Sequence, residues 1–249
     1  MIHINHLKKS YDSFTLECSL DIPKGIITGI IGMNGAGKST LFKNILGINP
    51  IDEGNIQIPD KQDIGVVLSE TGFSEFFTVS DIISILKCTY KRFDEDLFHS
   101  YCQRFDIPLD KKTRTFSTGM KAKLNIIIAL THHAKLLILD EPTAGLDVLT
   151  RDEILDILRD YMEQEDCTIL ISSHISSDLE SLCDDFYIID HGQIIMHEEM
   201  DTLLSLYGVL KVSKEDYKNL DKDYLLEVMK EPFGYSCLTN ERQFYSENY

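Results

Sequence analysis

The chain has 249 residues, 43% of them apolar, so it can bury a substantial core as one large domain or as one domain with an appendage. Its net charge of −17, from 41 acidic and 24 basic residues, repels the phosphates of nucleic acids and the headgroups of anionic lipids. We therefore expect no nucleic-acid partner. No apolar run approaches the ~20 residues that a transmembrane helix needs, so any membrane span would belong to another polypeptide.

The six cysteines are scattered along the chain without a C-x-x-C pair. This pattern indicates reduced and mostly buried thiols in a cytosolic protein. The N-terminus lacks the basic and apolar regions of a signal peptide. The adjacent His132 and His133 follow a helix-like run, which favours a solvated helix end over a metal site.

The first part of the chain predicts strands around a glycine-rich loop. Ile2–Leu7 and Thr15–Ile22 alternate apolar with polar residues, which indicates an antiparallel pair. An apolar run at 26–31 predicts a further strand. The glycine-rich segment 32–40 follows that strand and leads into a helix that ends near Leu46.

The middle of the chain, residues 78–133, is predicted to be mainly helical. Short strands at 56–58 and 64–68 precede it. The loop 69–78 carries three phenylalanines, which either form a contact surface or pack locally. The pattern predicts two helix starts in this region. Thr78, with Asp81 three residues later, caps the first helix, and Asp94 starts the second.

Strands and helices then alternate until a small C-terminal unit begins. Residues 136–139 are an apolar run, which predicts a fully buried parallel strand. The spacing of Thr150 and Glu153 predicts that Thr150 caps the next helix. We expect a first domain at 1–207 and a small α+β appendage at 208–249. Further predicted elements are strands at 168–172, 186–190, 193–197, 209–212, 224–229 and 235–238, and helices at 176–183, 199–207 and 214–220.

Residues 32–40 have the spacing G-x-x-x-x-G-K-[ST] between a strand and a helix, which is the context of a phosphate-binding loop. Glycines let successive backbone N–H groups point at a phosphate, and the positive end of the following helix adds to that field. Lys38 can reach the β- and γ-phosphates, and the Ser39 hydroxyl suits Mg²⁺. The sequence therefore predicts that the chain binds a nucleoside triphosphate. The candidate binding residues are Asn34, Gly35, Ala36, Gly37, Lys38, Ser39 and Thr40.

Two acidic residues and one histidine are candidates for hydrolysis of that triphosphate. Asp140 and Glu141 directly follow the buried strand, at the end where α/β sheets bind ligands. Asp140 would hold Mg²⁺ together with Ser39, and Glu141 would orient the attacking water as a general base. His174 follows another predicted strand and can hydrogen-bond the γ-phosphate and the water. Tyr11, ahead of the loop, is either a purine-stacking ring or a turn residue.

The order and spacing of these motifs resemble the nucleotide-binding subunits of ABC transporters, over roughly residues 1–207. The resemblance rests on the phosphate loop, the strand with its two acids, His174, and the segments Ser117–Met120 and Ala144–Asp147. The first of these segments, the signature segment, separates this family from other phosphate-loop NTPases. The resemblance implies an α/β fold of the ABC type, with a RecA-like core, an antiparallel β subdomain and a helical subdomain at about 72–133.

The resemblance also implies roles for residues outside the loop. Tyr11 would stack on adenine, and Asp147 would line the contact between two subunits that close head to tail around two ATP molecules. The signature segment, at the start of a helix, would point backbone amides at the γ-phosphate of ATP bound by the second subunit. Its residues are Ser117, Thr118, Gly119 and Met120.

Two positions depart from the family pattern. Thr118 and Met120 stand where the family usually has glycine and glutamine, so we expect function with altered affinity. Ser69 and Glu70 stand where the family has a glutamine that touches Mg²⁺. Glu70 is therefore only a candidate substitute as a metal contact.

The resemblance implies an ATPase motor that uses ATP and Mg²⁺ at the cytoplasmic face of the cell membrane. It would bind a separate transmembrane permease subunit, through a dock that includes Phe73, Phe76 and Phe77, and a second nucleotide-binding subunit. Within the family the chain resembles ABC-2-type exporters of peptides, bacteriocins or antibiotics. The alternative is a soluble ABC-type ATPase acting on ribosomes or DNA, or a nucleotide-gated regulatory protein. The single domain, the negative charge and the presence of both Glu141 and His174 count against that alternative.

Overall fold

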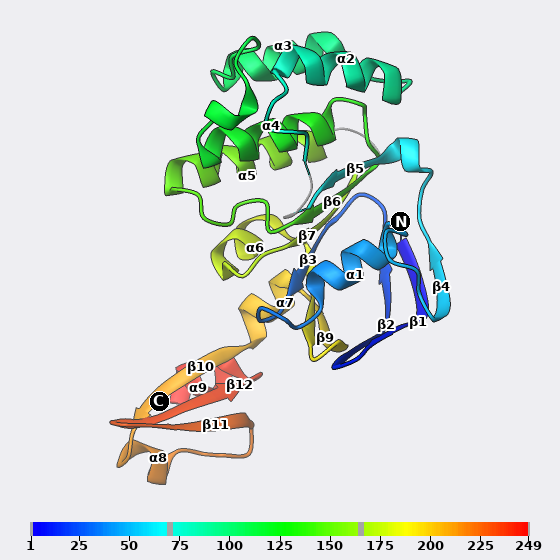
Figure 1. Cartoon of the computed structure of the whole chain (residues 1–249). Helices are drawn as coiled ribbons and strands as arrows, with labels where there is room; N and C mark the ends of the chain where they lie inside the picture. The colour runs from blue at the N-terminus through cyan, green and yellow to red at the C-terminus, as the bar shows by residue number, and fades with distance from the viewer. Residues whose placement is uncertain (1, 69–71, 164–166, 249) are drawn as a thin grey trace. The chain divides into compact units, whose positions relative to one another are not determined.

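The computed structural model describes residues 2–68, 72–163 and 167–248 (Figure 1). Two compact units are present, Met1–His197 and Glu198–Tyr249. The break lies ten residues before the expected boundary at 207/208. Helix α7 (Met200–Leu206) belongs to the second unit, where it contacts α9 (Arg242–Asn248). Arg242 Nη1 donates a hydrogen bond to the Leu204 carbonyl at 2.6 Å.

A six-stranded sheet forms the centre of the first unit (Figure 1). The pairs β5–β6, β6–β7, β7–β3 and β3–β8 are parallel, as the alternation of strands and helices predicts. Every residue of β6 and β7 is buried, which confirms the predicted buried parallel strand at 136–139. In sheet order the strands are β5 (Ile64–Val67), β6 (Leu136–Asp140), β7 (Thr168–Ser172), β3 (Ile27–Ile31), β8 (Asp185–Asp190) and β9 (Gln193–Glu199).

A three-stranded antiparallel sheet packs with α1 (Lys38–Ile45) against the central sheet. Strand β1 (Ile2–Tyr11) lies between β2 (Phe14–Ile22) and β4 (Glu53–Gln57). The β1–β2 pairing confirms the predicted antiparallel pair. Leu41, Phe42 and Ile45 of α1 are buried in one core cluster with residues of both sheets, so α1 is fixed between them.

Three helices cover the opposite face of the central sheet: α4 (Thr118–Leu130), α5 (Val148–Met162) and α6 (Ser176–Leu182) (Figure 1). A side chain at Gly65 of β5 would collide with the Ala129 carbonyl of α4. Glycine at this position therefore lets the helix and the strand approach closely. Gly29 of β3 likewise has no side chain, and this leaves room for Leu179 and Cys183 beside the strand.

The predicted helical subdomain contains α2 (Val79–Thr89) and α3 (Glu95–Arg104), with α4 beneath them. Thr78 and Asp81 form the predicted capping box, and the Asp94 carboxylate accepts a hydrogen bond from the Leu97 N–H. Two short 3₁₀ helices, η1 (Lys61–Asp63) and η2 (Thr113–Thr115), flank this region.

Helix α5 begins earlier than the sequence predicted. Asp147, and not Thr150, is the N-cap: its carboxylate accepts hydrogen bonds from the Thr150 N–H (3.0 Å) and Oγ1 (2.8 Å). The prediction of Thr150 as the cap was therefore wrong. Asp147 and Thr150 are three residues apart, as are Thr150 and Glu153, so the spacing allows either residue pair to begin the helix. Only the backbone conformation decides which residue is the N-cap. The backbone hydrogen bond from Thr150 lowers the pKa of Asp147.

The second unit contains a three-stranded antiparallel sheet and short helices. Leu220, Cys237 and Tyr245 form its buried core. Its helices are short: α8 (Asp216–Asn219) lies within the helix predicted at 214–220, whereas the sequence pattern did not predict α9. Its sheet has the order β10 (Gly208–Ser213), β12 (Gly234–Thr239), β11 (Leu225–Glu231).

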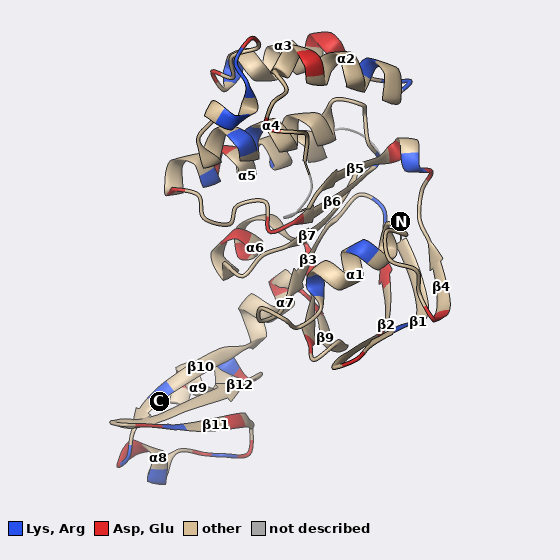
Figure 2. Ribbon diagram, viewed as in Figure 1, with Lys and Arg blue, Asp and Glu red and all other residues tan. Residues whose placement is uncertain are grey.

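Acidic residues occur on many elements of both units, so the negative charge is not concentrated in one segment (Figure 2). No helix in the described part of the chain has both the length and the apolar character needed to span a bilayer.

The cysteines are free thiols, and five of the six are buried. Burial raises the pKa of Cys18 to about 12 and that of Cys102 to about 11. These two thiols are therefore protonated and chemically inert at neutral pH. Cys88 on α2 is the exposed one.

His132 is not part of a solvated helix end, and that prediction was wrong. The residue is 1% exposed, its Nε2 hydrogen-bonds the Ile64 carbonyl (3.1 Å), and its ring stacks on Tyr90 with centroids 4.0 Å apart. The contacts come from segments distant in sequence, so the helical periodicity could not predict them. His133 is exposed, as expected for a helix end. Burial lowers the pKa of His132 below 6.5.

We expect this buried ring to make stability depend on pH. Because its folded pKa lies below the unfolded value, the stabilising effect is present above pH 6.5 and is lost as pH falls through the folded pKa. Between pH 7.5 and 5.5, the free energy of unfolding measured with urea should therefore fall less for the His132→Gln variant than for the wild type. His133→Gln, a change in the exposed neighbour, is the matched control. Equal pH slopes for wild type and His132→Gln would contradict this expectation.

Candidate active site

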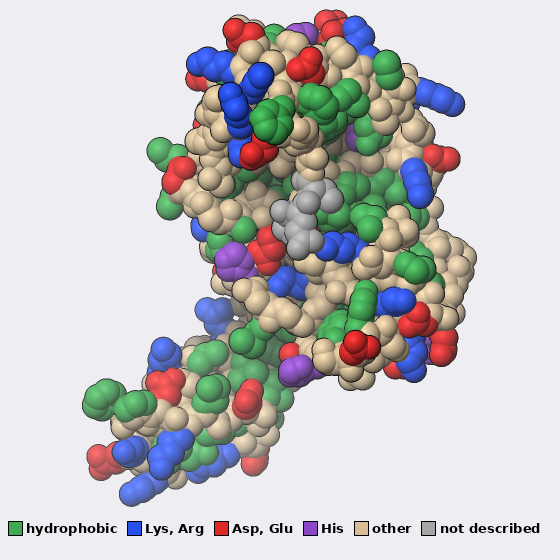
Figure 3. All heavy atoms as spheres, in the orientation of Figure 1, with side chains coloured by type: hydrophobic (Ala, Val, Ile, Leu, Met, Phe, Trp, Pro, Cys, Tyr) green, Lys and Arg blue, Asp and Glu red, His purple; other side chains and the backbone are tan. Residues whose placement is uncertain are grey.

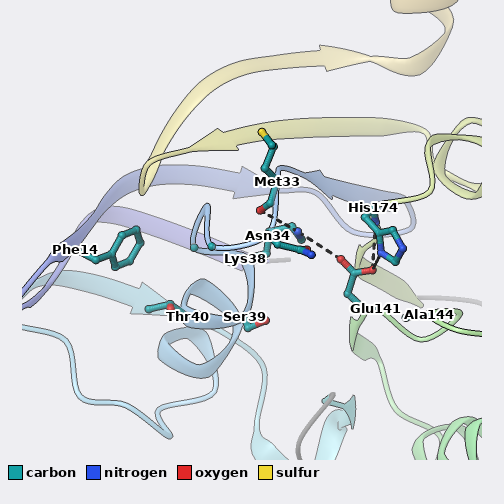
Figure 4. Close-up of a pocket in the computed structure, with 11 residues that line it drawn as sticks. Phe14, Met33, Asn34, Lys38, Ser39, Thr40, Glu141, Ala144 and His174 are labelled. Atoms are coloured by element: carbon teal, nitrogen blue, oxygen red, sulfur yellow. Dashed lines mark hydrogen bonds and ion pairs between the residues drawn. The ribbon is translucent and has the colours of Figure 1, made fainter.

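A pocket of about 440 Å³ lies where the glycine loop meets the carboxyl ends of the central strands (Figure 4). Strand β3 leads into the loop, β6 ends at Asp140, and β7 ends at Ser172. Parallel strands bring these ends to one edge of the sheet, although they are far apart in sequence. The lining residues are Phe14, Met33, Asn34, Gly35, Gly37, Lys38, Ser39, Thr40, Glu141, Ala144 and His174.

The loop backbone adopts conformations that need glycine. Gly35 has φ 83° and Gly37 has φ 117°, both in the left-handed region. Gly37 is also the N-cap of α1, and within the described residues no side chain caps this helix. The first N–H groups of α1 therefore remain available to an anion, and the helix dipole favours negative charge there.

Lys38 is 6% exposed and is held inside the loop. Its Nζ donates to the Gly32 carbonyl at 2.7 Å and to the Met33 carbonyl at 3.4 Å. Glu141 Oε1 lies 3.4 Å from the same Nζ. A buried ammonium needs nearby negative charge, and here one carboxylate and two carbonyls supply it. The position of Lys38 is thus set for an anion in the pocket.

Glu141 occupies a strained backbone position directly after β6. Its φ is 52°, which is uncommon for a residue other than glycine and costs energy. Its N–H donates to the carbonyl (3.2 Å) and the Oγ (3.1 Å) of Ser172 on β7. This turn directs the carboxylate into the pocket, between Lys38 and His174 (Figure 4).

His174 contacts Glu141 with both its backbone and its ring. The His174 N–H donates to Glu141 Oε2 at 3.2 Å, and His174 Nδ1 hydrogen-bonds the same oxygen. The histidine side chain is half exposed, whereas the glutamate side chain is 16% exposed. An acid and an imidazole in direct contact at the edge of an anion pocket can together orient a water molecule.

Asp140 is 2% exposed and lies beside β7 at its register partner Ser172. The Ser172 hydroxyl donates to Asp140 Oδ1 at 2.7 Å. Hard cations prefer such oxygen donors. No group of three or more His, Cys, Asp or Glu side chains suited to a metal occurs among the residues described. A cation here would therefore depend on further oxygen ligands.

Several predicted site residues lie outside this pocket lining. Ser117 caps α4, and its Oγ accepts from the Met120 N–H at 3.2 Å. A Cβ at Gly119 would lie 3.0 Å from Thr150 Cγ2, so the signature segment packs against the first turn of α5. Asp147 is exposed at that same turn. Ser69 and Glu70 lie outside the described residues.

Tyr11 is also absent from the lining, and Phe14 takes part instead. Tyr11 is 42% exposed, and its hydroxyl accepts a hydrogen bond from Asn49 Nδ2 at 3.2 Å. The two rings lie 6.2 Å apart across the hairpin. The sequence reasoning missed Phe14, and the available signal was its place at the start of β2, beside the same turn.

The pocket has the parts of a nucleotide hydrolase, and comparison with known proteins gives its family. The family model described as ABC transporter matches residues 16–144. A model described as an AAA domain matches residues 112–177. The chain belongs to the ABC transporter family, and it is an ATP-binding subunit.

Individual relatives support this assignment. The chain is 35% identical over 212 residues to the lantibiotic transport ATP-binding protein SrtF of Streptococcus pyogenes, covering 81% of this chain and 92% of that protein. It is 32% identical over 248 residues to the linearmycin resistance ATP-binding protein LnrL of Bacillus subtilis, covering 92% and 78%.

Solved structures agree on the fold. A structure of an ATP-binding subunit of an ABC transporter superposes with a TM-score of 0.73 at 26% identity, covering 81% of this chain and 90% of that chain. The dimeric ATP-binding cassette MJ0796 bound to ADP and Pi gives a TM-score of 0.71 at 19% identity, covering 80% and 99%. The predicted ABC-type α/β fold is confirmed.

The chain is therefore an ATPase that serves as the motor subunit of a transporter. The comparisons favour this function over the soluble ribosome- or DNA-acting ATPase and over the regulatory protein.

We expect Glu141→Gln to abolish turnover and to leave ATP binding intact. The amide keeps the shape of the side chain but cannot accept a proton from water, and a general base contributes roughly 10²–10⁴-fold to a rate. Phosphate release and calorimetry measure the two effects separately. Glu17→Gln, in an exposed residue of β2, is the control and should hydrolyse ATP normally. Turnover by Glu141→Gln within threefold of wild type would rule out its role as the base.

Proposed function

We propose that this chain hydrolyses ATP between two nucleotide-binding subunits, and thereby drives export through a separate membrane protein. The observation that carries the proposal is the convergence of Lys38, Glu141 and His174 on one pocket beside the glycine loop. Lys38 and the loop amides bind the phosphates. Glu141 takes the proton of the attacking water, and His174 holds both the glutamate and the γ-phosphate.

Mg²⁺ accompanies ATP in this proposal. The Ser39 hydroxyl, next to Lys38 in the pocket lining, and the buried Asp140 carboxylate would supply hard oxygen donors, and the phosphates and water would supply the rest. The cation would neutralise charge that develops on the phosphates. Glu70 remains a candidate contact only.

A second subunit completes the site. The N-terminus of α4 exposes Ser117 and Thr118, and helix-terminal amides favour a phosphate. The signature segment (Ser117, Thr118, Gly119 and Met120) would read the γ-phosphate held by the partner, with Asp147 at the contact. Loss of that phosphate on hydrolysis removes the charge that these amides hold, so the subunits separate.

The purine would lie against the aromatic pair at the β1–β2 hairpin. Phe14 lines the pocket, whereas Tyr11 is not among the lining residues and its hydroxyl accepts a hydrogen bond from Asn49. The Phe14 ring lies directly beside the phosphate loop, since a Cβ built at Gly37 would be only 2.9 Å from Phe14 Cζ. The purine of a nucleotide whose phosphates lie in this loop would therefore meet Phe14 first.

The membrane partner would bind the helical subdomain, at the cytoplasmic face of the membrane. Phe76 is 66% exposed and Phe77 37%, and Arg114 lies over the Phe76 ring at 5.8 Å. Figure 3 shows apolar side chains beside lysine and arginine side chains on this part of the surface. An exposed aromatic pair with an arginine is typical of a protein contact. Phe73, in the same segment of the chain, is half-buried.

The names of two relatives support a class of cargo. SrtF is named for lantibiotic transport and LnrL for linearmycin resistance. We therefore propose export of a peptide or an antibiotic-like molecule.

We expect Phe14→Ala to weaken ATP affinity more than Tyr11→Ala. Loss of an aromatic ring that stacks on a base costs ~1–3 kcal/mol, or roughly 5- to 150-fold in affinity. Calorimetry with ATP and with inorganic triphosphate measures this, because only ATP has the purine. A larger loss for Tyr11→Ala would place the purine at Tyr11 instead.

The docking surface can be tested in the chain's own host cell. A tagged wild-type chain should copurify, from detergent-solubilised membranes, with a polypeptide that contains several apolar spans. The double variant Phe76→Ser/Phe77→Ser should lose that polypeptide and keep its ATPase activity. Phe233→Ser is the matched control, since Phe233 is 93% exposed on the other unit. Recovery of the wild-type chain and of both variants without a membrane protein would refute the proposed membrane partner.

A further inference from the structure

A buried carboxylate lies behind the active site and joins three segments of the chain. Asp178 on α6 is 1% exposed. Its Oδ2 accepts a hydrogen bond from Thr143 Oγ1 at 2.7 Å, and its Oδ1 lies 3.0 Å from Arg151 Nε. Thr143 is in the loop after β6, and Arg151 is in the first half of α5. We call Thr143, Arg151 and Asp178 the Asp178 cluster.

Such a cluster is energetically demanding. A buried carboxylate is tolerated only with close partners, because desolvation costs several kcal/mol per ion. Removal of one partner leaves the other charge uncompensated. The cluster therefore strongly restrains the distance between the loop, α5 and α6. A hydrophobic contact of the same size would allow more sliding.

The cluster is adjacent in sequence to both residues that act on water. Thr143 is two residues after Glu141, and Asp178 is four residues after His174. Glu141 and His174 contact each other directly. The two segments are thus joined twice, once in the pocket by Glu141–His174 and once behind it by Thr143–Asp178. Two links fix an orientation, whereas one link allows rotation.

Arg151 extends this connection to the surface that carries the signature segment. Its Nη2 donates to Ser177 Oγ at 3.3 Å, which adds a second contact to α6. The preceding residue, Thr150, is held by Asp147 and packs against Gly119. The cluster therefore lies between the catalytic pair and the turn that presents Asp147.

We propose that Asp178 is a positioning residue for ATP hydrolysis. It holds the loop that carries Glu141 against the helix behind His174, so that the glutamate and the imidazole meet a water in the correct geometry. The residue touches neither ATP nor the water. Its loss lowers kcat and leaves ATP affinity nearly unchanged, because the polar contacts of the cluster join the loop after β6 to α5 and α6 and not to the phosphate loop, as far as the described residues show.

The test compares kcat and ATP dissociation constants of the purified full-length chain. Asp178→Asn should lower kcat about 10-fold or more and change ATP affinity less than about threefold. Thr143→Val keeps the size of the side chain and removes the hydroxyl donor, so kcat should fall by a smaller factor. Thr143→Ser restores the donor and should restore kcat. In the double variant Asp178→Asn/Thr143→Val, the fall in kcat should be less than the product of the single effects.

A matched control lies on the same two helices. Arg159 of α5 reaches Ser181 of α6, with Nη2 at 3.3 Å from Oγ, farther along the helices from Glu141. Arg159→Ala should reduce thermal stability and leave kcat unchanged.

Three results would overturn the proposal: wild-type kcat for Asp178→Asn and Thr143→Val, equal loss of kcat for Arg159→Ala, or a loss confined to ATP affinity. The wild-type chain, assayed in parallel, reports ATPase activity by itself, so the positioning role can fail while the ATPase assignment stands. If Asp178→Asn does not fold, the Thr143→Val and Thr143→Ser pair decides the outcome.

Discussion

The contact between the Lys38 ammonium and the Glu141 carboxylate is the interaction on which the site depends. Their 3.4 Å separation lies in a pocket where both side chains are largely withdrawn from water. In such surroundings a charge needs a partner of opposite sign. A triphosphate carries more negative charge than one carboxylate, so in the proposed function ATP would take over Lys38 and leave Glu141 to act on water. Binding and catalysis would then be linked through this exchange of partners.

That contact in turn requires the parallel sheet. Lys38 follows β3, Glu141 follows β6 and His174 follows β7, and these three strands are neighbours in the order β6-β7-β3. Burial of β6 and β7 on both faces keeps the strand ends in register. The positive φ of Glu141 then turns its carboxylate toward the loop, at a cost in backbone energy that the hydrogen bonds to Ser172 offset.

A single short loop serves two surfaces of the molecule. Its beginning carries Glu141 into the pocket, and its end carries Asp147 to the N-terminus of α5. Thr143, between them, is buried and anchored to Asp178. A change at the surface that presents Asp147 and Gly119 can therefore reach Glu141, the proposed general base, over a few residues. This arrangement suits the proposed function, in which turnover would depend on a second subunit.

The local sequence determined much of this protein. The glycine spacing at 32–40, the apolar run before Asp140 and the capping residues Thr78 and Asp94 are signals in which neighbouring residues specify their own backbone, and the structure agrees with the elements they predict. The tertiary structure alone decided which residues meet across the fold. Phe14 enters the pocket, His132 is buried beside Tyr90 and Ile64, and Asp178 pairs with Thr143 and Arg151. Each of these contacts joins segments that no periodic pattern relates, because side-chain packing between distant elements depends on where the sheet and helices place them and not on the order of residues nearby.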